Sequence, residues 1–372
     1  MAIRSPAAPN PVPSVLMTVE PPGTMWPHAD TLVRELSALG VEVTVAALTP
    51  LRPGQRIEFA GIPGVELAAC PTPAATPAEH LANRSRIADW LLGLEEMLNP
   101  DVVHLTGYLH AGLPWCGKVL VAGHPGAGAA YGRLDAEQRR ICRAAFQHGL
   151  KGADMMVTPT EAMMSALQRH FGIVPGRVIR DGRDPSRFTP VPKEPVILSV
   201  GGLREDCSQR SPLEAAAPRL PWPVVVAGDQ LDADGRPVRL EGISALGRMH
   251  PTQLLPWFNR AAIYVALTAE GPGTWAMEAA LAGCALVLGD TAALREMWSG
   301  AALFVNPGDP DALAAGLRTL LGDRRLREAM GLAARRRALR NPARAMAEAY
   351  LAAYRDLMAA RAPNQFAEEK QG

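Results

Sequence analysis

The residue types best suited to chemistry gather in one segment of the chain, between positions 263 and 290. An apolar run at 263–267 predicts a buried strand, and a helix is expected from Thr274 onward. Gly273 precedes that helix, whose first N–H groups and positive dipole end favour an anion such as a diphosphate. Glu270 and Glu278 flank this turn, where a carboxylate could accept hydrogen bonds from a sugar diol. A plain helix with two solvated glutamates would give the same pattern.

Two series of apolar runs alternating with helical segments surround that segment. In the first series we expect strands at 15–19, 41–48, 101–105, 118–122 and 154–158, with helices at 27–39, 81–98, 135–150 and 161–170. Strands that alternate with helices predict parallel pairing and right-handed crossovers. The first half of the chain is therefore expected to form a doubly wound α/β domain.

A proline-rich stretch at 189–195 separates this series from a second one, because prolines disfavour the interior of strands and helices. The second series predicts strands at 196–200, 224–227, 243–246, 262–267, 285–288 and 301–305, and helices at 212–217, 251–260 and 274–282. Three helices close the chain. We expect an N-terminal domain at 1–190, a C-terminal domain at 191–345, a last helix at 346–361 and a disordered polar tail at 362–372. The two sheets would face each other across a cleft that binds ligands at their strand ends.

The bulk composition excludes several classes of protein. The chain has 372 residues, a net charge of +1 and 5% aromatic residues, which argues against a nucleic-acid partner. The first residues lack the apolar core of a signal peptide, and no run is long enough to span a membrane. Five scattered cysteines without a C-x-x-C pair indicate buried thiols in a reducing compartment. We therefore expect a cytoplasmic protein without a transmembrane segment.

Several motifs together resemble one family of enzymes. The pattern Glu270-x7-Glu278 is followed by the apolar block that ends at Asp290, and by Leu294-Arg-Glu296 and the stretch 302–310. The segments 158–161 and 178–182 match the close of a first domain. Nearly the whole chain is covered in this way, and it resembles the retaining glycosyltransferases of the GT-B fold, family 4. The resemblance implies two Rossmann-like domains and a final helix that crosses back to the first domain.

The resemblance also implies roles for individual residues. Glu278 would hold the ribose diol of a nucleotide sugar, and Glu270 would face the donor hexose. His124, which follows a predicted strand, would lie near the anomeric centre, although a lone histidine is often structural. The other donor-binding positions implied are Gly23, Gly201, Gly202, Gly247, Arg248, Gly273 and Thr274. Turn geometry alone would also explain the glycine at Gly23.

The loop at 201–210 departs from the family pattern. The family places an Arg and a Lys there to neutralise the departing diphosphate, and this chain has Gly202 and Ser208 instead. Asp181 replaces an expected Asn and adds a negative charge. Arg204 and Arg210 could take over the diphosphate, because arginine is a capable bidentate ligand of phosphate. Alternatively the donor site has lost its activity.

Two further patterns carry less chemistry. Asp232-Ala-Asp234 matches a metal-binding spelling from another glycosyltransferase fold, but it predicts a surface turn, and we expect no metal. The basic run 335–337 with Arg340 predicts a solvated helix face. Contact with an anionic membrane is the alternative interpretation of that run, if the acceptor is a lipid.

The residues and the resemblance together favour a metal-independent hexosyltransferase without a cofactor, and the resemblance implies retention of the anomeric configuration. It would use a nucleoside-diphosphate sugar as donor and an acceptor that is a small molecule, a glycan or a lipid. A glycosyltransferase-like protein that only binds a ligand or a partner subunit is the alternative. Homo- or hetero-oligomers are compatible with both interpretations.

Overall fold

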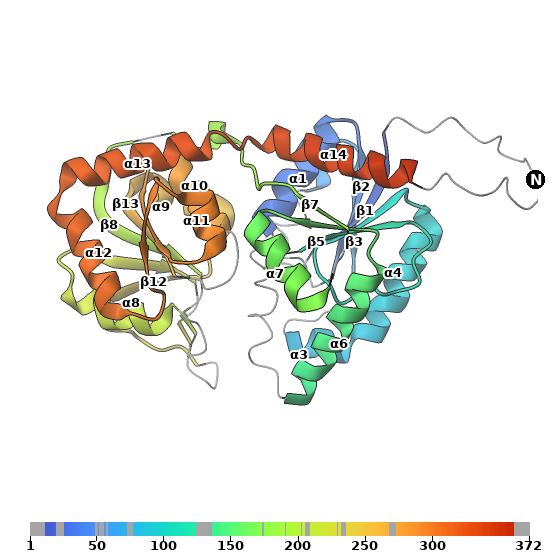
Figure 1. The fold of residues 1–372 in the computed structure, drawn as a ribbon, viewed down its shortest axis with the longest axis horizontal. Helices are drawn as coiled ribbons and strands as arrows, with labels where there is room; N and C mark the ends of the chain where they lie inside the picture. Colours follow the sequence, from blue (N-terminus) through green and yellow to red (C-terminus); the bar gives the residue numbers. More distant parts are fainter. Residues whose placement is uncertain are drawn as a thin grey trace, which may run out of the picture.

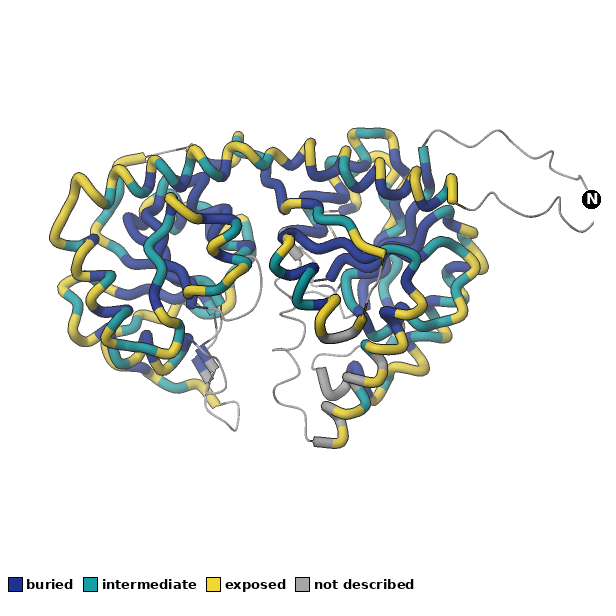
Figure 2. Tube along the Cα trace, viewed as in Figure 1, coloured by how far each residue is buried: buried dark blue, intermediate teal, exposed yellow. Residues whose placement is uncertain are grey.

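The chain folds into two α/β units that lie side by side (Figure 1). It crosses from the first unit to the second after Val178, the first crossing, and returns to the first unit after Ala338, the second crossing. The structure is a computed structural model. It describes residues 12–19, 26–48, 51, 56, 59–72, 77–123, 136–172, 175–189, 191–201, 203–204, 209–228, 230–231, 236–267 and 273–360. Buried residues form a separate centre in each unit, as the dark tube in Figure 2 shows.

The first unit is built on a parallel sheet that has seven strands among the described residues, in the order β3-β2-β1-β4-β5-β6-β7. β1 lies in the middle and pairs in register with β2 and β4. Because helices cover both faces, the central strands are mostly apolar and are buried along nearly their whole length, as in parallel sheets generally. The strands are β1 (Ser14–Val19), β2 (Glu42–Ala47), β3 (Val65–Ala69), β4 (Val102–Leu105), β5 (Lys118–Ala122), β6 (Met155–Thr158) and β7 (Gly176–Val178).

The second unit repeats this arrangement with a parallel sheet of six described strands, in the order β12-β10-β8-β13-β14-β15. In both sheets the strand order reverses next to the first strand, between β1 and β4 and between β8 and β13. Ligands of such sheets bind beyond the carboxyl ends of the strands at this reversal. The strands are β8 (Glu194–Val200), β10 (Val224–Ala227), β12 (Ile243–Gly247), β13 (Ala261–Ala266), β14 (Ala285–Gly289) and β15 (Ala302–Val305), and β9 (Leu203–Arg204) pairs with β11 (Gln230–Leu231) beside the sheet.

Helices connect the strands and cover the sheets. In the first unit these are α1 (Trp26–Ala38), α3 (Pro77–Ala82), α4 (Arg84–Leu98), α6 (Ala136–Gly152) and α7 (Glu161–Phe171). In the second they are α8 (Arg210–Ala216), α9 (Pro251–Arg260), α10 (Thr274–Leu281), α11 (Ala292–Trp298), α12 (Pro310–Gly322) and α13 (Arg324–Ala338). The α/β class with two Rossmann-like units is thus confirmed.

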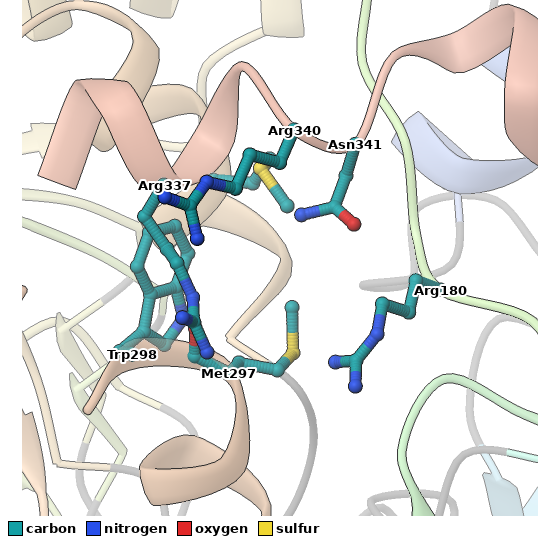
Figure 3. A pocket seen from close by; sticks show the side chains of 7 residues that line it. Arg180, Met297, Trp298, Arg337, Arg340 and Asn341 are labelled. Atoms are coloured by element: carbon teal, nitrogen blue, oxygen red, sulfur yellow. The ribbon is translucent and has the colours of Figure 1, made fainter.

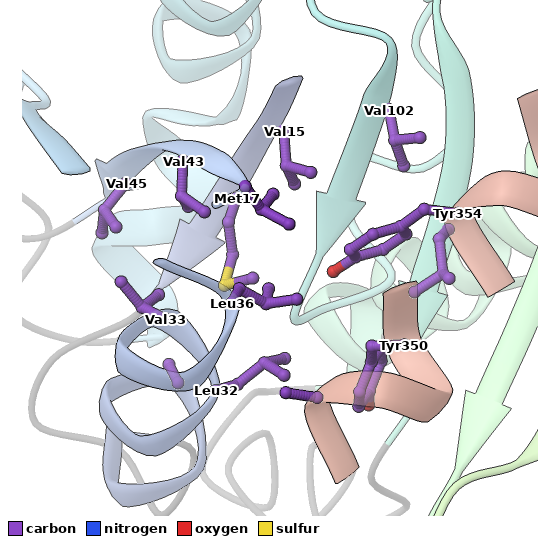
Figure 4. Close-up of a cluster of buried hydrophobic side chains, with 14 of the residues drawn as sticks. Val15, Met17, Leu32, Val33, Leu36, Val43, Val45, Val102, Tyr350 and Tyr354 are labelled. Carbon is purple, nitrogen blue, oxygen red and sulfur yellow. The ribbon is translucent and has the colours of Figure 1, made fainter. Parts of the chain in front are cut away.

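The last helix, α14 (Ala343–Ala359), leaves the second unit and packs on α1 of the first. Its tyrosines Tyr350 and Tyr354 are fully buried beside Leu32, Val102 and other core residues (Figure 4). The Nδ1 atom of His104 on β4 lies 2.6 Å from the hydroxyl of Tyr354. The expected crossing of the final helix to the first domain is therefore confirmed.

Some elements differ from the sequence predictions. The edge strands β3 and β7 and the short helix α11 were not expected, and the helix expected at 81–98 is interrupted at Asn83. Pro195 lies inside β8 rather than in a linker, next to its first residue. Cys70 and Cys284 are buried as expected, but Cys116 is exposed. The tail expected at 362–372 lies outside the described residues.

Candidate functional site

The start of α10 lies at the carboxyl end of β13, where the strand order of the second sheet reverses. Gly273 is the N-cap and has a left-handed backbone with φ 68°. A Cβ atom there would lie 3.0 Å from Cδ2 of Leu294, so this position requires glycine for its conformation and for space. Gly273 has no side chain with which to cap α10. The first N–H groups of α10, beginning at the buried Thr274, are therefore suited to an anionic ligand.

One turn into α10, the carboxylate of Glu278 is buried and faces a guanidinium. Its Oε1 lies 3.4 Å from Nε of Arg183, and the side chains are 8% and 3% exposed. Burial raises the pKa of Glu278 above its usual value, while Arg183 and Arg187 oppose that rise. Asp30 on α1 raises the pKa further by repulsion. Glu278 therefore lies where residues of the first unit can control its charge.

Arg183 belongs to the first crossing between the two units. Its Nη1 donates to the carbonyl of Gly182 at 2.8 Å, and its own carbonyl accepts from the N–H of Ala343 at 3.1 Å. Its N–H donates to the carbonyl of Asn341, in the second crossing. The two crossings thus hold Arg183 in place against Glu278. Sequence reasoning missed this residue, although it directly follows the motif at 178–182.

Asp181 lies beside a buried histidine of the first unit. Its Oδ1 lies 2.9 Å from Nδ1 of His28 on α1, and both side chains are almost fully buried. The ring of His28 also contacts the ring of Tyr350 edge-on. Asp181, which the sequence analysis expects to add a negative charge to the donor site, therefore has a buried partner in the first unit.

Described residues beyond the ends of β8 and β10 contact the ends of β13 and β12. The buried Gln209 accepts a hydrogen bond at 3.4 Å from the N–H of Leu267, at the end of β13. Gly247 has φ 69°, and its carbonyl accepts from the N–H of Gly228 at 2.8 Å. Tyr264 on β13 is buried, and burial and the charge of Glu278 raise its pKa. Sequence reasoning missed both Gln209 and Tyr264.

The structure brings some of the sequence-predicted residues together and leaves others undescribed. Gly273, Thr274 and Glu278 share α10, whereas Gly201, Gly247 and Arg248 lie at the ends of β8 and β12. Nε of Arg210 lies 3.6 Å from Oε2 of Glu214 within α8. Arg204 contributes its backbone to β9, and its side chain is not described. Gly23, His124, Gly202 and Glu270 lie outside the described residues.

Comparison with protein families decides the identity of this architecture. Residues 23–182 match the model of the "Glycosyl transferase 4-like domain", and residues 194–323 match "Glycosyl transferases group 1". The chain belongs to the GT-B glycosyltransferases. No curated protein sequence matches the chain.

Solved structures share this glycosyltransferase fold at low sequence identity. A sucrose-phosphate synthase from Thermosynechococcus elongatus superposes with a TM-score of 0.78 at 18% identity, covering 93% of this chain and 99% of that one. HepE from Anabaena, in complex with UDP and glucose, gives 0.73 at 13% identity over 92% and 100%. An E. coli structure described as trehalose-6-phosphate bound with UDP-2-fluoro glucose gives 0.63 at 15% identity over 93% and 99%.

In this glycosyltransferase a carboxylate on α11 bridges the two units. Glu296 accepts hydrogen bonds from the N–H groups of Glu161 and Ala162 at 3.1 and 2.9 Å, at the start of α7. It also lies 3.3 Å from Nη2 of Arg180 in the first crossing. Glu296 on α11 thus accepts from backbone N–H groups at the start of α7 that have no partner within their own helix, and so connects the two units.

The described residues contain neither a cluster of metal ligands nor a helix that could span a membrane. Among the described residues, no three His, Cys, Asp or Glu side chains gather as a metal site would require. Asp232 and Asp234 lie outside those residues, so their assignment to a surface turn stays a prediction. No described helix is both long and apolar enough to cross a membrane.

The basic run on α13 differs from the solvated face that the sequence predicts. The Nη1 atom of Arg335 donates to the carbonyl of Leu281. Arg337 donates to the carbonyls of Met297 and Glu296, at 2.8 and 3.0 Å. Two members of the run are therefore tied to neighbouring helices, which disfavours the membrane-contact alternative for them.

Proposed function

We propose that this glycosyltransferase moves a hexose from a nucleoside-diphosphate sugar to an acceptor, with retention of the anomeric configuration. The observation that supports the proposal best is the buried Arg183–Glu278 pair, one turn below the uncapped start of α10. Diphosphate and ribose are joined in the donor. A set of N–H donors one helical turn from a desolvated carboxylate suits both groups at once.

In this proposal α10 binds the donor at two levels. The N–H groups near Gly273 and Thr274 take the diphosphate, and the helix dipole offsets part of its charge. Glu278 accepts hydrogen bonds from the ribose hydroxyls, and Arg183 orients its carboxylate and opposes the rise in pKa that burial causes. No metal is needed for this binding mode, because backbone donors and cations carry the phosphate charge.

The remaining roles rest on residues around this centre. Glu270 faces the hexose, and His124 stabilises the sugar as the diphosphate departs from the face that the acceptor attacks. Gly23, Gly201, Gly202, Gly247 and Arg248 line the donor path. Arg204 and Arg210 replace the cations that the family places in the loop after β8. Arg210 would turn from Glu214, whose Oε2 lies 3.6 Å from its Nε, to the donor.

Three similar structures suggest the first nucleotide to try. HepE was determined with UDP and with UDP-glucose, and the E. coli structure holds UDP-2-fluoro glucose. We therefore propose a UDP-hexose as the first donor to test. The acceptor remains a small molecule, a glycan or a lipid in this proposal.

The alternative, a protein that binds a ligand without catalysing transfer, has one observation in its favour. The loop after β8 has Gly202 and Ser208 where the family carries cations. Without compensation, loss of each such donor would slow transfer about a hundredfold or more. The protein would then bind a donor or a partner subunit without turnover.

The test uses the slow hydrolysis of the donor that occurs without an added acceptor. Proton NMR monitors the anomeric form of the hexose as it is released. With an α-linked UDP-hexose and a chelator present, we expect the α-hexose to appear before it equilibrates. Early release of the β-hexose would overturn retention, and a requirement for divalent metal would overturn metal independence. Donor binding without release of hexose would favour the partner-subunit alternative.

A further inference from the structure

A separate pocket of ≈ 240 Å³ lies where the two units meet under the chain crossings. It is lined by Arg180 of the first crossing, Met277 of α10, Met297 and Trp298 of α11, and Arg337, Arg340 and Asn341 at and after the end of α13. Figure 3 shows Arg337 on the upper helix, Arg340 and Asn341 in the turn that follows it, and Arg180 approaching from the side. Nothing in the proposed donor binding uses this pocket.

The polar lining of this pocket is strongly cationic. Three guanidinium groups line it, and Glu296 beside Arg180 is the carboxylate paired with the lining. Arg337 is fixed by its bonds to the two α11 carbonyls, which occupy two of its five N–H donors. Arg340 is exposed to solvent. The lining therefore carries more positive charge and more hydrogen-bond donors than Glu296 alone can pair with.

Trp298 adds an independent sign of a missing acceptor. Its side chain is 1% exposed, and its Nε1 is buried without a hydrogen-bond partner among the described residues. An indole N–H can only donate, and leaving such a donor buried and unpaired costs about 1–3 kcal/mol. Because that nitrogen is itself buried, an acceptor oxygen of a ligand would reach it only after the neighbouring side chains move.

We propose that this hinge pocket binds a small phosphate-bearing anion, either inorganic phosphate or a phosphate monoester. Phosphate presents only acceptor oxygens and matches the fork of a guanidinium. The pocket is smaller than the usual range of about 300–1,000 Å³ for sites of larger ligands, so a whole nucleotide sugar does not fit.

Occupancy of the pocket would bias the arrangement of the two units. Arg180 and Asn341 come from the two crossings, and the remaining lining belongs to the second unit. An anion held by both would stabilise the arrangement described here through its differential affinity. Met277 lies directly before Glu278, which couples the pocket to the proposed donor site.

The test is isothermal titration of the full chain with inorganic phosphate and, separately, with glycerol phosphate at millimolar concentration. We expect Arg340→Ala to weaken binding about tenfold, as expected for losing one charge-assisted contact. Trp298→Phe keeps the ring and removes the donor, so it should weaken binding less. The matched control is Arg336→Ala, because Arg336 is exposed on the same helix and does not line the pocket.

The outcomes separate the sources and the sites. Tighter binding of glycerol phosphate would assign a monoester, and tighter binding of inorganic phosphate would assign the free anion. No heat with either probe would overturn the proposal. Equal weakening in Arg336→Ala, or loss of binding only in Arg248→Ala at the proposed donor site, would overturn it as well.

Discussion

Arg183 and Glu278 form a buried ion pair at the proposed donor site. A carboxylate without its cation would be costly at that depth, because burial already raises its pKa. The pair also joins the first crossing of the chain to α10. Its strength can therefore be measured as stability and as donor binding independently.

We predict that Arg183→Met lowers the free energy of unfolding by about 3 kcal/mol or more, because it strands a buried carboxylate. The double variant Arg183→Met with Glu278→Met should regain part of that loss, as measured by denaturant unfolding. Arg219→Met supplies the control, since Arg219 and Asp311 are 2.7 Å apart but solvent-exposed. That pair should contribute less than about 1 kcal/mol. Equal losses in both single variants would contradict the assigned role.

Gly273 offers a second residue-scale test. We predict that Gly273→Ala destabilises the fold by about 1–3 kcal/mol and weakens donor binding, because it strains φ and crowds Leu294. Gly300→Ala is the matched control, since Gly300 also has positive φ but open space around it. Thermal unfolding and donor titration would compare the two. If Gly300→Ala weakened donor binding as much, the start of α10 would not be the cause.

Among the elements, α7 and α11 form one of the polar contacts between the two units. Glu296→Ala should cost about 1 kcal/mol of stability, as the loss of a helix cap does. It should also raise the radius of gyration in small-angle scattering, because the two units lose a bridge. Glu328→Ala on α13 removes an exposed pair within one helix and should change neither quantity. An unchanged radius of gyration for Glu296→Ala would show that this contact does not hold the units.

The docking of α14 on β4 should be sensitive to acid. Burial lowers the pKa of His104 from 6.5 to about 3, so folded His104 stays neutral where the unfolded residue gains a proton. Between those values the unfolded state binds more protons, and stability must fall as the pH falls. Above pH 6.5 the effect vanishes.

We predict that unfolding midpoints drop steadily from pH 6.5 downward and that His104→Gln flattens part of this slope. Thermal unfolding at several pH values would measure it. His148→Gln is the control, since that side chain contacts solvent and the carbonyl of Gly112. An unchanged slope in His104→Gln would show that His104 does not contribute to the loss of stability in acid. His110, whose pKa burial also lowers to about 3, contributes a remaining share.

The interior elements were predictable from sequence because their patterns are strong. Runs such as Val224–Ala227 and the helix Pro251–Arg260 have the bounds that the sequence predicts. The strands β3 and β7 were missed because they are short edge strands with partly exposed residues. Helix α11 was missed because its seven residues are too few to show a period.

The site was only partly predictable. Glu278 and Gly273 belong to one contiguous motif, so local spacing was enough to find them. Arg183 and Gln209 contact Glu278 and Leu267 across the fold, and only the packing of elements distant in sequence creates those contacts. Glu296 stood in a recognised motif, but its contact with α7 depends on how the two units meet.

At the scale of the whole molecule, two Rossmann-like units meet at two chain crossings, and the proposed donor and anion sites both lie near that junction. Stability and ligand binding should therefore be coupled. A ligand that binds only the folded, assembled chain raises the unfolding midpoint in proportion to its affinity.

The most direct test is calorimetric titration of the wild-type chain with UDP-, GDP- and ADP-hexoses. We predict that at least one donor binds and that Glu278→Ala weakens its binding about tenfold or more, as expected for lost hydrogen bonds to a charged group. No heat from any of these nucleotide sugars would contradict the proposed donor site.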